Sequence, residues 1–133
     1  MAGKVAFSAS RPAACREDRT CPSIIFESIS LNLGASYDPD TGVFTAPRDG
    51  VYSFSWSAIS STFYERSHAG YLRIQLMVNG DPVAGSIGTR TTSGNKVIIL
   101  RNGDTVSLRT EKGHQRQQLL ERADQTVFNG FLI

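Results

Sequence analysis

The strongest constraint on the fold is a strict alternation of apolar and polar residues that recurs along the chain. In 51–58 the even-numbered residues are all apolar, and they include Tyr52, Phe54 and Trp56, whereas three of the odd-numbered residues are serines. Successive side chains of a strand point to opposite faces of its sheet, so this pattern predicts a strand with one buried face and one polar face. The same pattern in 72–78 predicts a second such strand.

The rest of the chain reads as further short strands separated by turns. The other strand candidates are Val5–Ser10, Ile24–Leu33, Val43–Thr45, Val83–Ile87, Lys96–Leu100, Thr105–Thr110 and Thr126–Ile133. Asn79-Gly80 and Asn102-Gly103 are strong hairpin signals because both residue types tolerate positive φ, and Asp38–Gly42 has the composition of a turn. Helical periodicity is nearly absent, and 115–123 reads as a long polar loop. About eight to ten strands without helices predict an all-β sandwich or barrel.

The run Val97–Leu100 is apolar at every position. Continuous apolar runs are typical of strands that are buried on both faces. We therefore expect this strand to lie either in the centre of a sheet or against another subunit. The run is far too short to cross a bilayer, so no membrane insertion is expected.

Length and charge favour a single domain without a nucleic-acid partner. The chain has 133 residues and a formal net charge of +2, from 14 basic and 12 acidic residues. This length suits one domain, and the charge is not the strongly one-signed charge of a nucleic-acid-binding protein. We expect one domain over residues 4–133, with residues 1–3 as a remnant of a linker or of an added tag.

The two cysteines, Cys15 and Cys21, flank a short polar loop with no nearby histidine. Two ligands are too few for a zinc site, and we favour a disulfide, with free thiols as the alternative. A disulfide would imply an oxidising compartment. The first residues lack the apolar stretch of a signal peptide, which leaves a cytosolic protein or a trimmed secreted one.

No residue pattern points to catalysis. His68 and His114 lie far apart in polar stretches and have no partner at a ligand spacing. The chain contains no nucleophile elbow, no phosphate-binding glycine-rich loop and no zinc-protease motif. Asp38 and Asp40 flank a proline and read more plainly as turn formers than as a catalytic pair. We therefore expect a binding or assembly module and not an enzyme.

A set of spaced motifs resembles the globular C1q domain family over nearly the full length. These motifs are Val5–Arg11, Ile25-Phe26, Asn32, Tyr37–Pro47, Gly50–Phe54, Val78–Gly80, Arg101–Val106 and Val127–Ile133. The resemblance implies a ten-stranded jelly-roll sandwich like that of tumour necrosis factor, which assembles as a trimer. It also implies secretion, with the signal peptide removed. A homotrimer is the expected assembly.

Members of this family recognise surfaces, so the resemblance implies a recognition function. We expect a secreted pattern-recognition protein that binds microbial or anionic glycans, lipopolysaccharide or a cell-surface protein through many weak contacts. One alternative is a receptor-binding ligand of cytokine-like or synaptic type. Another is the trimerising end domain of a longer extracellular matrix protein.

The sequence departs from the family pattern at two places. Phe44-Thr45-Ala46-Pro47 stands where the family often has a cysteine before the proline, so a bridge through that cysteine is impossible. Some members bind calcium through acidic residues ahead of a motif matched here by Thr92-Ser93-Gly94. The preceding 83–92 contains no acidic residue and does contain Arg90. Because calcium prefers carboxylate ligands, we expect no calcium site of this type and no other cofactor.

Candidate functional residues fall into two groups. Those expected in the core or in the trimer interface, without a distinction between the two, are Tyr52, Phe54, Trp56, Met77, Val97, Ile99, Phe128 and Phe131. Those expected to contact ligand are Tyr64, Glu65, Arg66 and His68, where aromatic and charged residues interleave, together with Arg48, Arg90, Arg116 and Arg122. Arginine suits anionic polysaccharide because its planar group forms charge-assisted hydrogen bonds.

Overall fold

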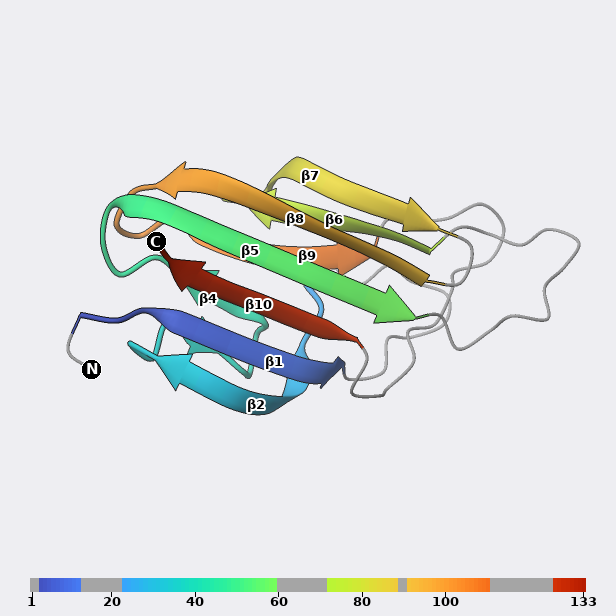
Figure 1. The fold of residues 1–133 in the computed structure, drawn as a ribbon, viewed down its shortest axis with the longest axis horizontal. Coiled ribbons are helices and arrows are strands. Elements are labelled where there is room, and N and C mark those ends of the chain that lie inside the picture. Colours follow the sequence, from blue (N-terminus) through green and yellow to red (C-terminus); the bar gives the residue numbers. More distant parts are fainter. Residues whose placement is uncertain (1–2, 13–22, 60–71, 89–90, 111–125) are drawn as a thin grey trace, which may run out of the picture.

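The chain folds into a sandwich of two antiparallel five-stranded sheets (Figure 1). The computed structural model describes residues 3–12, 23–59, 72–88, 91–110 and 126–133. Sheet A has the order β2-β1-β10-β5-β8 and sheet B the order β3-β4-β9-β6-β7. The strands are β1 (Ala6–Pro12), β2 (Phe26–Leu33), β3 (Tyr37–Asp38), β4 (Val43–Thr45), β5 (Gly50–Ile59), β6 (Leu72–Val78), β7 (Asp81–Gly88), β8 (Thr91–Leu100), β9 (Thr105–Thr110) and β10 (Val127–Leu132).

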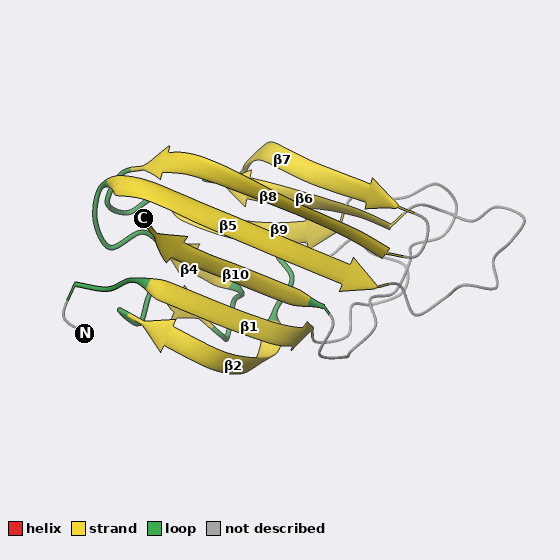
Figure 2. Cartoon of the chain, viewed as in Figure 1, coloured by secondary structure: helices red, strands yellow, loops and turns green. Residues whose placement is uncertain are grey.

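The predicted all-β class is confirmed, with strands only among the described residues (Figure 2). The short strand β3, next to the Asp38–Gly42 turn, was not among the predicted strands. The predicted strand 96–100 begins earlier, at Thr91. Its first half is polar, and it is held in the sheet by its pairing with β5, from Ile59↔Thr91 to Gly50↔Leu100.

The core between the sheets is built from aromatic side chains. Phe7 of β1 stacks on Tyr37 and Phe44 with ring centroids 4.8 and 5.2 Å apart, and it meets the edge of Phe128 at 4.9 Å. Phe54 is fully buried beside this cluster. Offset-stacked and edge-to-face pairs add to the free energy gained by burial. The inward residues of each alternating segment therefore supply the core, as the sequence pattern predicts.

Gly130 marks a place in β10 where the core has no room for a side chain. A Cβ atom there would lie 2.6 Å from a ring carbon of Phe7 and 2.7 Å from one of Phe54. Gly130 pairs with Phe7 on one side and with Phe54 on the other. The two neighbouring rings fill the space over the glycine, so the sheet remains closely packed at this point.

The two Asn-Gly dipeptides form turns of different kinds. Asn79 and Gly80, with φ of 52° and 88°, connect β6 to β7 as a two-residue hairpin. The hairpin predicted at Asn102-Gly103 is wrong, because β8 belongs to sheet A and β9 to sheet B. There the chain crosses between the sheets, and Asp104 stabilises the crossing by accepting the Arg101 backbone N–H at 2.9 Å.

Strand β8 is one of the two edge strands of sheet A, so the expectation that 97–100 lies in the centre of a sheet is wrong, and its alternative, a contact with another subunit, stays a prediction. Its side chains alternate between the two faces. Leu100 is buried, whereas Val97 and Ile99 are 57 % and 74 % exposed. The side chains of the continuous apolar run therefore alternate between the core on one side of β8 and the outer face of sheet A on the other.

Candidate functional site

Four of the five strands of sheet A, namely β1, β10, β5 and β8, carry no charge at the outward positions that pair across the strands. The exposed charged residues of these strands, Arg11 and Lys96, lie outside those positions. Residues that pair directly across strands share a face, and the outward residues alternate with the buried ones. The outward residues are Ala6, Ser8, Ser10, Val127, Asn129, Phe131, Val51, Ser53, Ser55, Ser57, Ile59, Thr91, Ser93, Asn95, Val97 and Ile99. None of these residues is charged. Solvent-facing sheet surfaces normally carry charged side chains, so this face has the composition of a contact surface.

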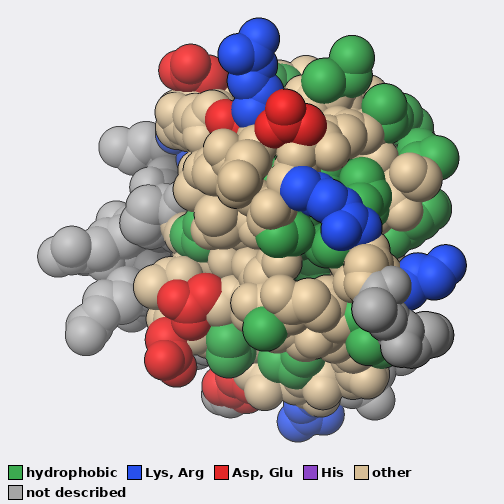
Figure 3. Space-filling view, turned by 90° about the vertical axis from the view of Figure 1, so that its left-hand side faces the viewer, with side chains coloured by type: hydrophobic (Ala, Val, Ile, Leu, Met, Phe, Trp, Pro, Cys, Tyr) green, Lys and Arg blue, Asp and Glu red, His purple; other side chains and the backbone are tan. Residues whose placement is uncertain are grey.

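The apolar residues of this face gather toward the end of the sandwich that carries both termini. Val51 and Ile99 are paired neighbours, and Phe131 lies on the next strand with an exposed fraction of 48 %. Leu31 of β2 and the terminal Ile133 are also exposed. Seen from this end, hydrophobic side chains gather along the upper part of one margin of the molecule, and a Lys or Arg side chain lies below them on the same margin (Figure 3). A contiguous exposed apolar patch marks an interaction site.

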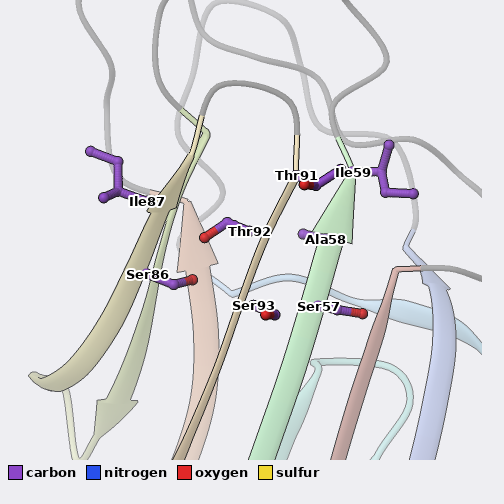
Figure 4. A pocket seen from close by; sticks show the side chains of 8 residues that line it. All are labelled: Ser57, Ala58, Ile59, Ser86, Ile87, Thr91, Thr92 and Ser93. Atoms are coloured by element: carbon purple, nitrogen blue, oxygen red, sulfur yellow. The ribbon is translucent and has the colours of Figure 1, made fainter.

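A groove of about 530 Å³ opens at the opposite end of β5, between β8 and β7. Its lining residues are Ser57, Ala58, Ile59, Ser86, Ile87, Thr91, Thr92 and Ser93. The side chains of Ser86 and Thr92 point toward each other across the gap between the strands, while Ile87 and Ile59 lie at the two margins (Figure 4). The lining thus offers hydroxyl groups and aliphatic carbon without charge, which suits an uncharged polar ligand.

Trp56, which lies one residue before the groove residue Ser57, connects the strands that line the groove. Its indole Nε1 donates a hydrogen bond of 2.9 Å to Ser86 Oγ. Gly94 of β8 faces the same ring, and a Cβ there would lie 2.4 Å from Trp56 Cζ2. The indole therefore occupies the space that a side chain at position 94 would need. This packing joins β5, β7 and β8 where the groove begins.

A second groove, of about 370 Å³, runs along β6 and β7 on sheet B. Its lining includes Arg73, Gln75 and Pro82. Gln75 Oε1 accepts a hydrogen bond of 2.8 Å from Arg109 Nε, so Arg109 is partly occupied by a structural contact. Arginine is thus found beside this groove, in contrast to the groove between β7 and β8.

Most of the predicted ligand-contacting residues lie outside the described part of the chain. These are Tyr64, Glu65, Arg66, His68, Arg90, Arg116 and Arg122, and the same holds for Cys15 and Cys21. Arg48 is described and exposed, and its guanidinium Nη2 donates a hydrogen bond to the backbone oxygen of Gly3. It precedes β5, whereas the groove between β7 and β8 lies at the far end of that strand.

The structure separates the residues that the sequence left as core or interface. Tyr52, Phe54, Trp56, Met77 and Phe128 are buried within the protomer, with exposed fractions of at most 5 %. Val97, Ile99 and Phe131 are exposed on the outer face of sheet A. Sequence reasoning missed two further exposed apolar residues of sheet A, Val51 and Leu31, as well as the groove residues. The uncharged odd positions of 51–58 were the one available signal for that face.

Neither a cluster of metal ligands nor a membrane-spanning helix is found among the described residues. The described residues contain no group of three or more histidine, cysteine, aspartate or glutamate side chains that could hold a metal ion. The absence of a family-type calcium site stays a prediction. Thr92-Ser93-Gly94 forms part of the edge strand β8. In the described part of the chain, no helix has the length and apolar character needed to cross a membrane.

Comparisons with known proteins identify the family. The C1q domain model matches residues 6–133. Human complement C1q tumor necrosis factor-related protein 3 is 33 % identical over 121 residues, which cover 83 % of this chain and 44 % of that protein. The zebrafish complement 1qA globular domain matches with a TM-score of 0.70 and 24 % identity over 97 % of both chains. Murine APRIL, at 9 % identity, matches with a TM-score of 0.74 over 98 % of this chain and 99 % of its own.

The chain belongs to the C1q domain family, with the jelly-roll sandwich that the resemblance implied. The likeness to murine APRIL shows the fold alone. The chain spans less than half the length of the curated relatives that it matches.

Proposed function

We propose that this protein is a secreted, non-enzymatic recognition protein that assembles as a homotrimer and binds repetitive ligands through repeated weak contacts. Three copies of a weak site gain avidity when the ligand is repetitive, by roughly a hundredfold or more. Microbial and anionic glycans are ligands of this kind. The proposal therefore joins an assembly surface to ligand sites that are presented in three copies.

The observation that carries the proposal is the uncharged outer face of sheet A. Ile99, Val97 and Phe131 expose about half or more of their side chains there, and the surrounding outward residues are serine, threonine, asparagine or small apolar side chains. Depletion of charge with an apolar centre is typical of surfaces that are buried between subunits. Burial of apolar area would supply the association free energy.

The ligand class follows from the groove between β7 and β8 and from the arginine-bearing segments. Ser86 and Thr92 in the groove supply hydroxyl groups suited to hydrogen bonds with neutral sugar hydroxyls. Anionic groups of a glycan would be bound by arginines such as Arg116 and Arg122. One trimer would then present three copies of each contact.

Sedimentation combined with a glycan and microbial-ligand array tests this function. The wild type should sediment as a trimer and bind arrayed repetitive glycans. Ile99→Glu should sediment as a monomer and lose array binding through lost avidity, because three buried carboxylates cannot be accommodated in an apolar interface. Thr45→Glu, on exposed β4 of sheet B, is the matched control and should remain trimeric. A trimer that binds no arrayed ligand would refute the glycan-recognition function.

The second candidate is a receptor-binding ligand, and the named relatives favour it. Two curated relatives, from human and mouse, are called complement C1q tumor necrosis factor-related protein 3. This function predicts saturable binding to one host membrane protein and no binding to glycans. Cell-surface binding of labelled trimer, with and without enzymatic removal of cell-surface glycans, distinguishes the two candidates.

The third candidate, an end domain that trimerises a longer extracellular protein, has one observation in its favour. The matched human relative is more than twice as long as the region it shares with this chain. The full-length transcript tests this candidate, since an upstream collagen-like or coiled-coil segment would support it.

A further inference from the structure

Three of the five asparagines of the chain stand directly before a glycine, and the fold places these three Asn-Gly pairs in different environments. Asn79-Gly80 forms the hairpin turn between β6 and β7. Asn129-Gly130 lies within β10, the middle strand of sheet A, and Asn102-Gly103 lies in the crossing from β8 to β9. An asparagine before glycine is prone to deamidation, because the backbone of glycine can approach the side chain without hindrance from a Cβ atom.

Deamidation of such a pair proceeds through a succinimide ring. The backbone nitrogen of the glycine gives up its proton and attacks Cγ of the asparagine, so that a bond forms between these two atoms. The Cγ–Nδ2 bond breaks, and the amide nitrogen takes up the proton and leaves as ammonia. Water then opens the ring at either carbonyl, which gives aspartate or isoaspartate. A fold can therefore block the reaction by fixing the asparagine side chain or by holding the glycine N–H.

The side chain of Asn79 is fixed by three hydrogen bonds. Its Nδ2 donates to Asp104 Oδ1 at 3.1 Å, and its Oδ1 accepts the backbone N–H and the hydroxyl of Thr105 at 2.9 and 3.3 Å. Ring closure requires Cγ to turn toward the nitrogen of Gly80, and this rotation breaks the three bonds together. Openings that break several contacts at once are rare, so Asn79 is protected in the folded chain.

Asn129 is protected by the sheet around it. Its Oδ1 accepts a hydrogen bond of 2.6 Å from Ser8 Oγ, and it pairs with Ser8 on one side and with Ser55 on the other. Gly130 is buried in the same strand. Ring closure would bend β10 out of the ladders with both of its neighbours, and core strands open only with most of the fold.

Asn102 has much less protection. Both Asn102 and Gly103 are exposed, and within the described part of the chain the Asn102 side chain has no hydrogen-bond partner. The backbone N–H of Asn102 donates to Asp49 Oδ1 at 2.8 Å, and that of Gly103 donates to the Ala46 backbone oxygen at 2.8 Å. Only the second of these bonds involves a reacting atom. A single hydrogen bond in an exposed turn opens by local fluctuation.

We propose that Asn102 is the modification site at which the folded protein deamidates, with water as co-reactant, and that the fold protects Asn79 and Asn129. The order of reactivity follows from what must open before the ring can close. At Asn102 this is one backbone hydrogen bond, at Asn79 three side-chain bonds, and at Asn129 part of the ladders of sheet A.

The products change the turn that carries the chain from sheet A to sheet B. Deamidation turns a neutral amide into a carboxylate, so the formal net charge of +2 falls by one. The new carboxylate lies in a turn that already contains Asp104 and contacts Asp49, and like charges in proximity repel. Isoaspartate also adds one main-chain atom between the N–H groups that bind Asp49 and Ala46. Both products are therefore expected to weaken the crossing.

The rates of deamidation at the three pairs test the assignment. Folded wild type is held at mildly alkaline pH, each Asn-Gly pair is followed by peptide mapping with mass spectrometry, and isoaspartate is detected with an isoaspartyl methyltransferase. We expect Asn102 to react at least about tenfold faster than Asn79 or Asn129, since more than one further hydrogen bond must open at those positions. Incubation of the unfolded chain in urea should remove most of this difference, because the protecting contacts are lost.

The stability of the aged protein tests the effect on the crossing. Ion exchange separates the more acidic aged form, and its urea midpoint should lie below that of fresh protein. Asn102→Ser cannot form the ring and should keep its midpoint during ageing. Asn95→Ser, at an exposed asparagine of β8 that no glycine follows, is the matched control and should age like wild type. Asn102→Asp reproduces the aspartate product alone and should lose less stability than the isoaspartate form.

Several results would overturn the proposal. Equal rates at the three pairs of the folded chain, or a faster reaction at Asn79 or Asn129, would refute the assignment. The same holds if Asn102 stays intact in the folded protein while it reacts in the unfolded chain, since the bond from Gly103 to Ala46 would then be sufficient protection. An aged Asn102→Ser that loses as much stability as wild type would refute the effect on the crossing.

Discussion

Trp56 of β5 and Ser86 of β7 are joined across the two sheets by a hydrogen bond of 2.9 Å from the indole Nε1 to the serine Oγ. Trp56 is 3 % exposed, so its N–H has little access to water. Ser86 is at the same time a lining residue of the groove between β7 and β8. One contact therefore satisfies a buried donor and positions one wall of the groove.

Replacement of this acceptor should destabilise the fold and disturb the groove together. Ser86→Ala leaves the Trp56 N–H buried without its partner, and we expect the free energy of unfolding to fall by about 1–2 kcal/mol. The chain contains a single tryptophan, so its fluorescence reports on this site alone. Urea unfolding followed by fluorescence gives the change in stability.

Two controls separate the hydrogen bond from the loss of a hydroxyl in general. Ser107→Ala, on β9 of sheet B, should change stability by no more than about 0.5 kcal/mol. In a Trp56→Phe background, where unfolding is followed by circular dichroism because the only tryptophan is gone, Ser86→Ala should cost much less than in wild type, since the donor is absent. Equal costs of Ser86→Ala in both backgrounds would contradict the importance of this bond.

The second prediction concerns Gly130, over which Phe7 and Phe54 close. Gly130→Ala places a methyl group 2.6 Å from one ring and 2.7 Å from the other. Because both rings are buried in a packed core, we expect a loss of stability of about 1–3 kcal/mol from overpacking. The denaturant midpoint should fall without a change in the unfolding slope.

A glycine with open space around it provides the control for Gly130. Gly80 in the β6–β7 turn has φ of 88° and no atom within 4 Å of a Cβ. Gly80→Asn should cost less than Gly130→Ala, since asparagine tolerates this backbone conformation. Phe54→Leu combined with Gly130→Ala should recover part of the loss relative to the sum of the single changes. Strict additivity of the two changes would argue against the predicted clash.

Much of the fold was predictable because its cause is local. The alternation in 51–58 and 72–78 depends on one face being buried, and that requirement is written in consecutive residues. The crossing at Asn102-Gly103 was not predictable in this way, because its dipeptide is identical in kind to the hairpin at Asn79-Gly80. Which sheet receives the next strand is decided by distant partners, such as Ala46 and Asp49, that bind the turn.

The candidate site was predictable only in part. The exposed pair Val51 and Ile99 comes from strands that are far apart in sequence, so no local pattern could place them side by side. The odd-numbered residues of 51–58 carry no charge, and this lack of charge was the one indication in the sequence that their face is a contact surface. The groove between β7 and β8 depends on the spacing of two sheet edges, which periodicity does not encode.

The third prediction concerns acid stability at the Asp104 crossing. The pKa of Asp104 is lowered chiefly by the hydrogen bond from the Arg101 backbone N–H, and further by the one from Asn79 Nδ2. A lowered pKa in the folded state means stability that is present above the unfolded pKa, near 3.8, and is lost as pH falls through the folded value.

Asp104→Asn should therefore destabilise the fold at neutral pH and reduce the loss of stability between neutral pH and about pH 3. Urea unfolding at several pH values measures both effects. Asp40→Asn, at an exposed aspartate in a different turn, is the control for the loss of one carboxylate. An unchanged acid profile in Asp104→Asn would contradict the assignment.

The last prediction concerns two buried tyrosines that respond oppositely to the same substitution. Tyr37 is 2 % exposed, and its hydroxyl has no hydrogen-bond partner of normal geometry among the described residues. Tyr52 donates its hydroxyl to the Arg48 backbone oxygen at 2.7 Å. Tyr37→Phe should therefore be neutral or stabilising by about 1 kcal/mol at neutral pH, whereas Tyr52→Phe should lose about that amount.

The change in the free energy of unfolding at alkaline pH provides a second test for Tyr37. Burial raises the pKa of Tyr37 from 10.0 to about 12, against a smaller opposing effect of the Phe26 backbone. The folded state therefore holds the phenolic proton more tightly than the unfolded chain. The resulting contribution of Tyr37 to the free energy of unfolding is fully present below pH 10 and is lost as pH rises toward 12. It amounts to about 2–3 kcal/mol.

Tyr37→Phe should remove most of this pH-dependent loss of stability, so the free energy of unfolding of the variant should fall less between pH 10 and 12 than that of wild type. Burial also raises the pKa of Tyr52, which leaves a residual slope in the variant. Urea unfolding of wild type and both variants between pH 10 and 12 measures how the free energy of unfolding changes with pH. If that change were the same in wild type and Tyr37→Phe, Tyr37 would ionise as readily in the folded protein as in the unfolded chain.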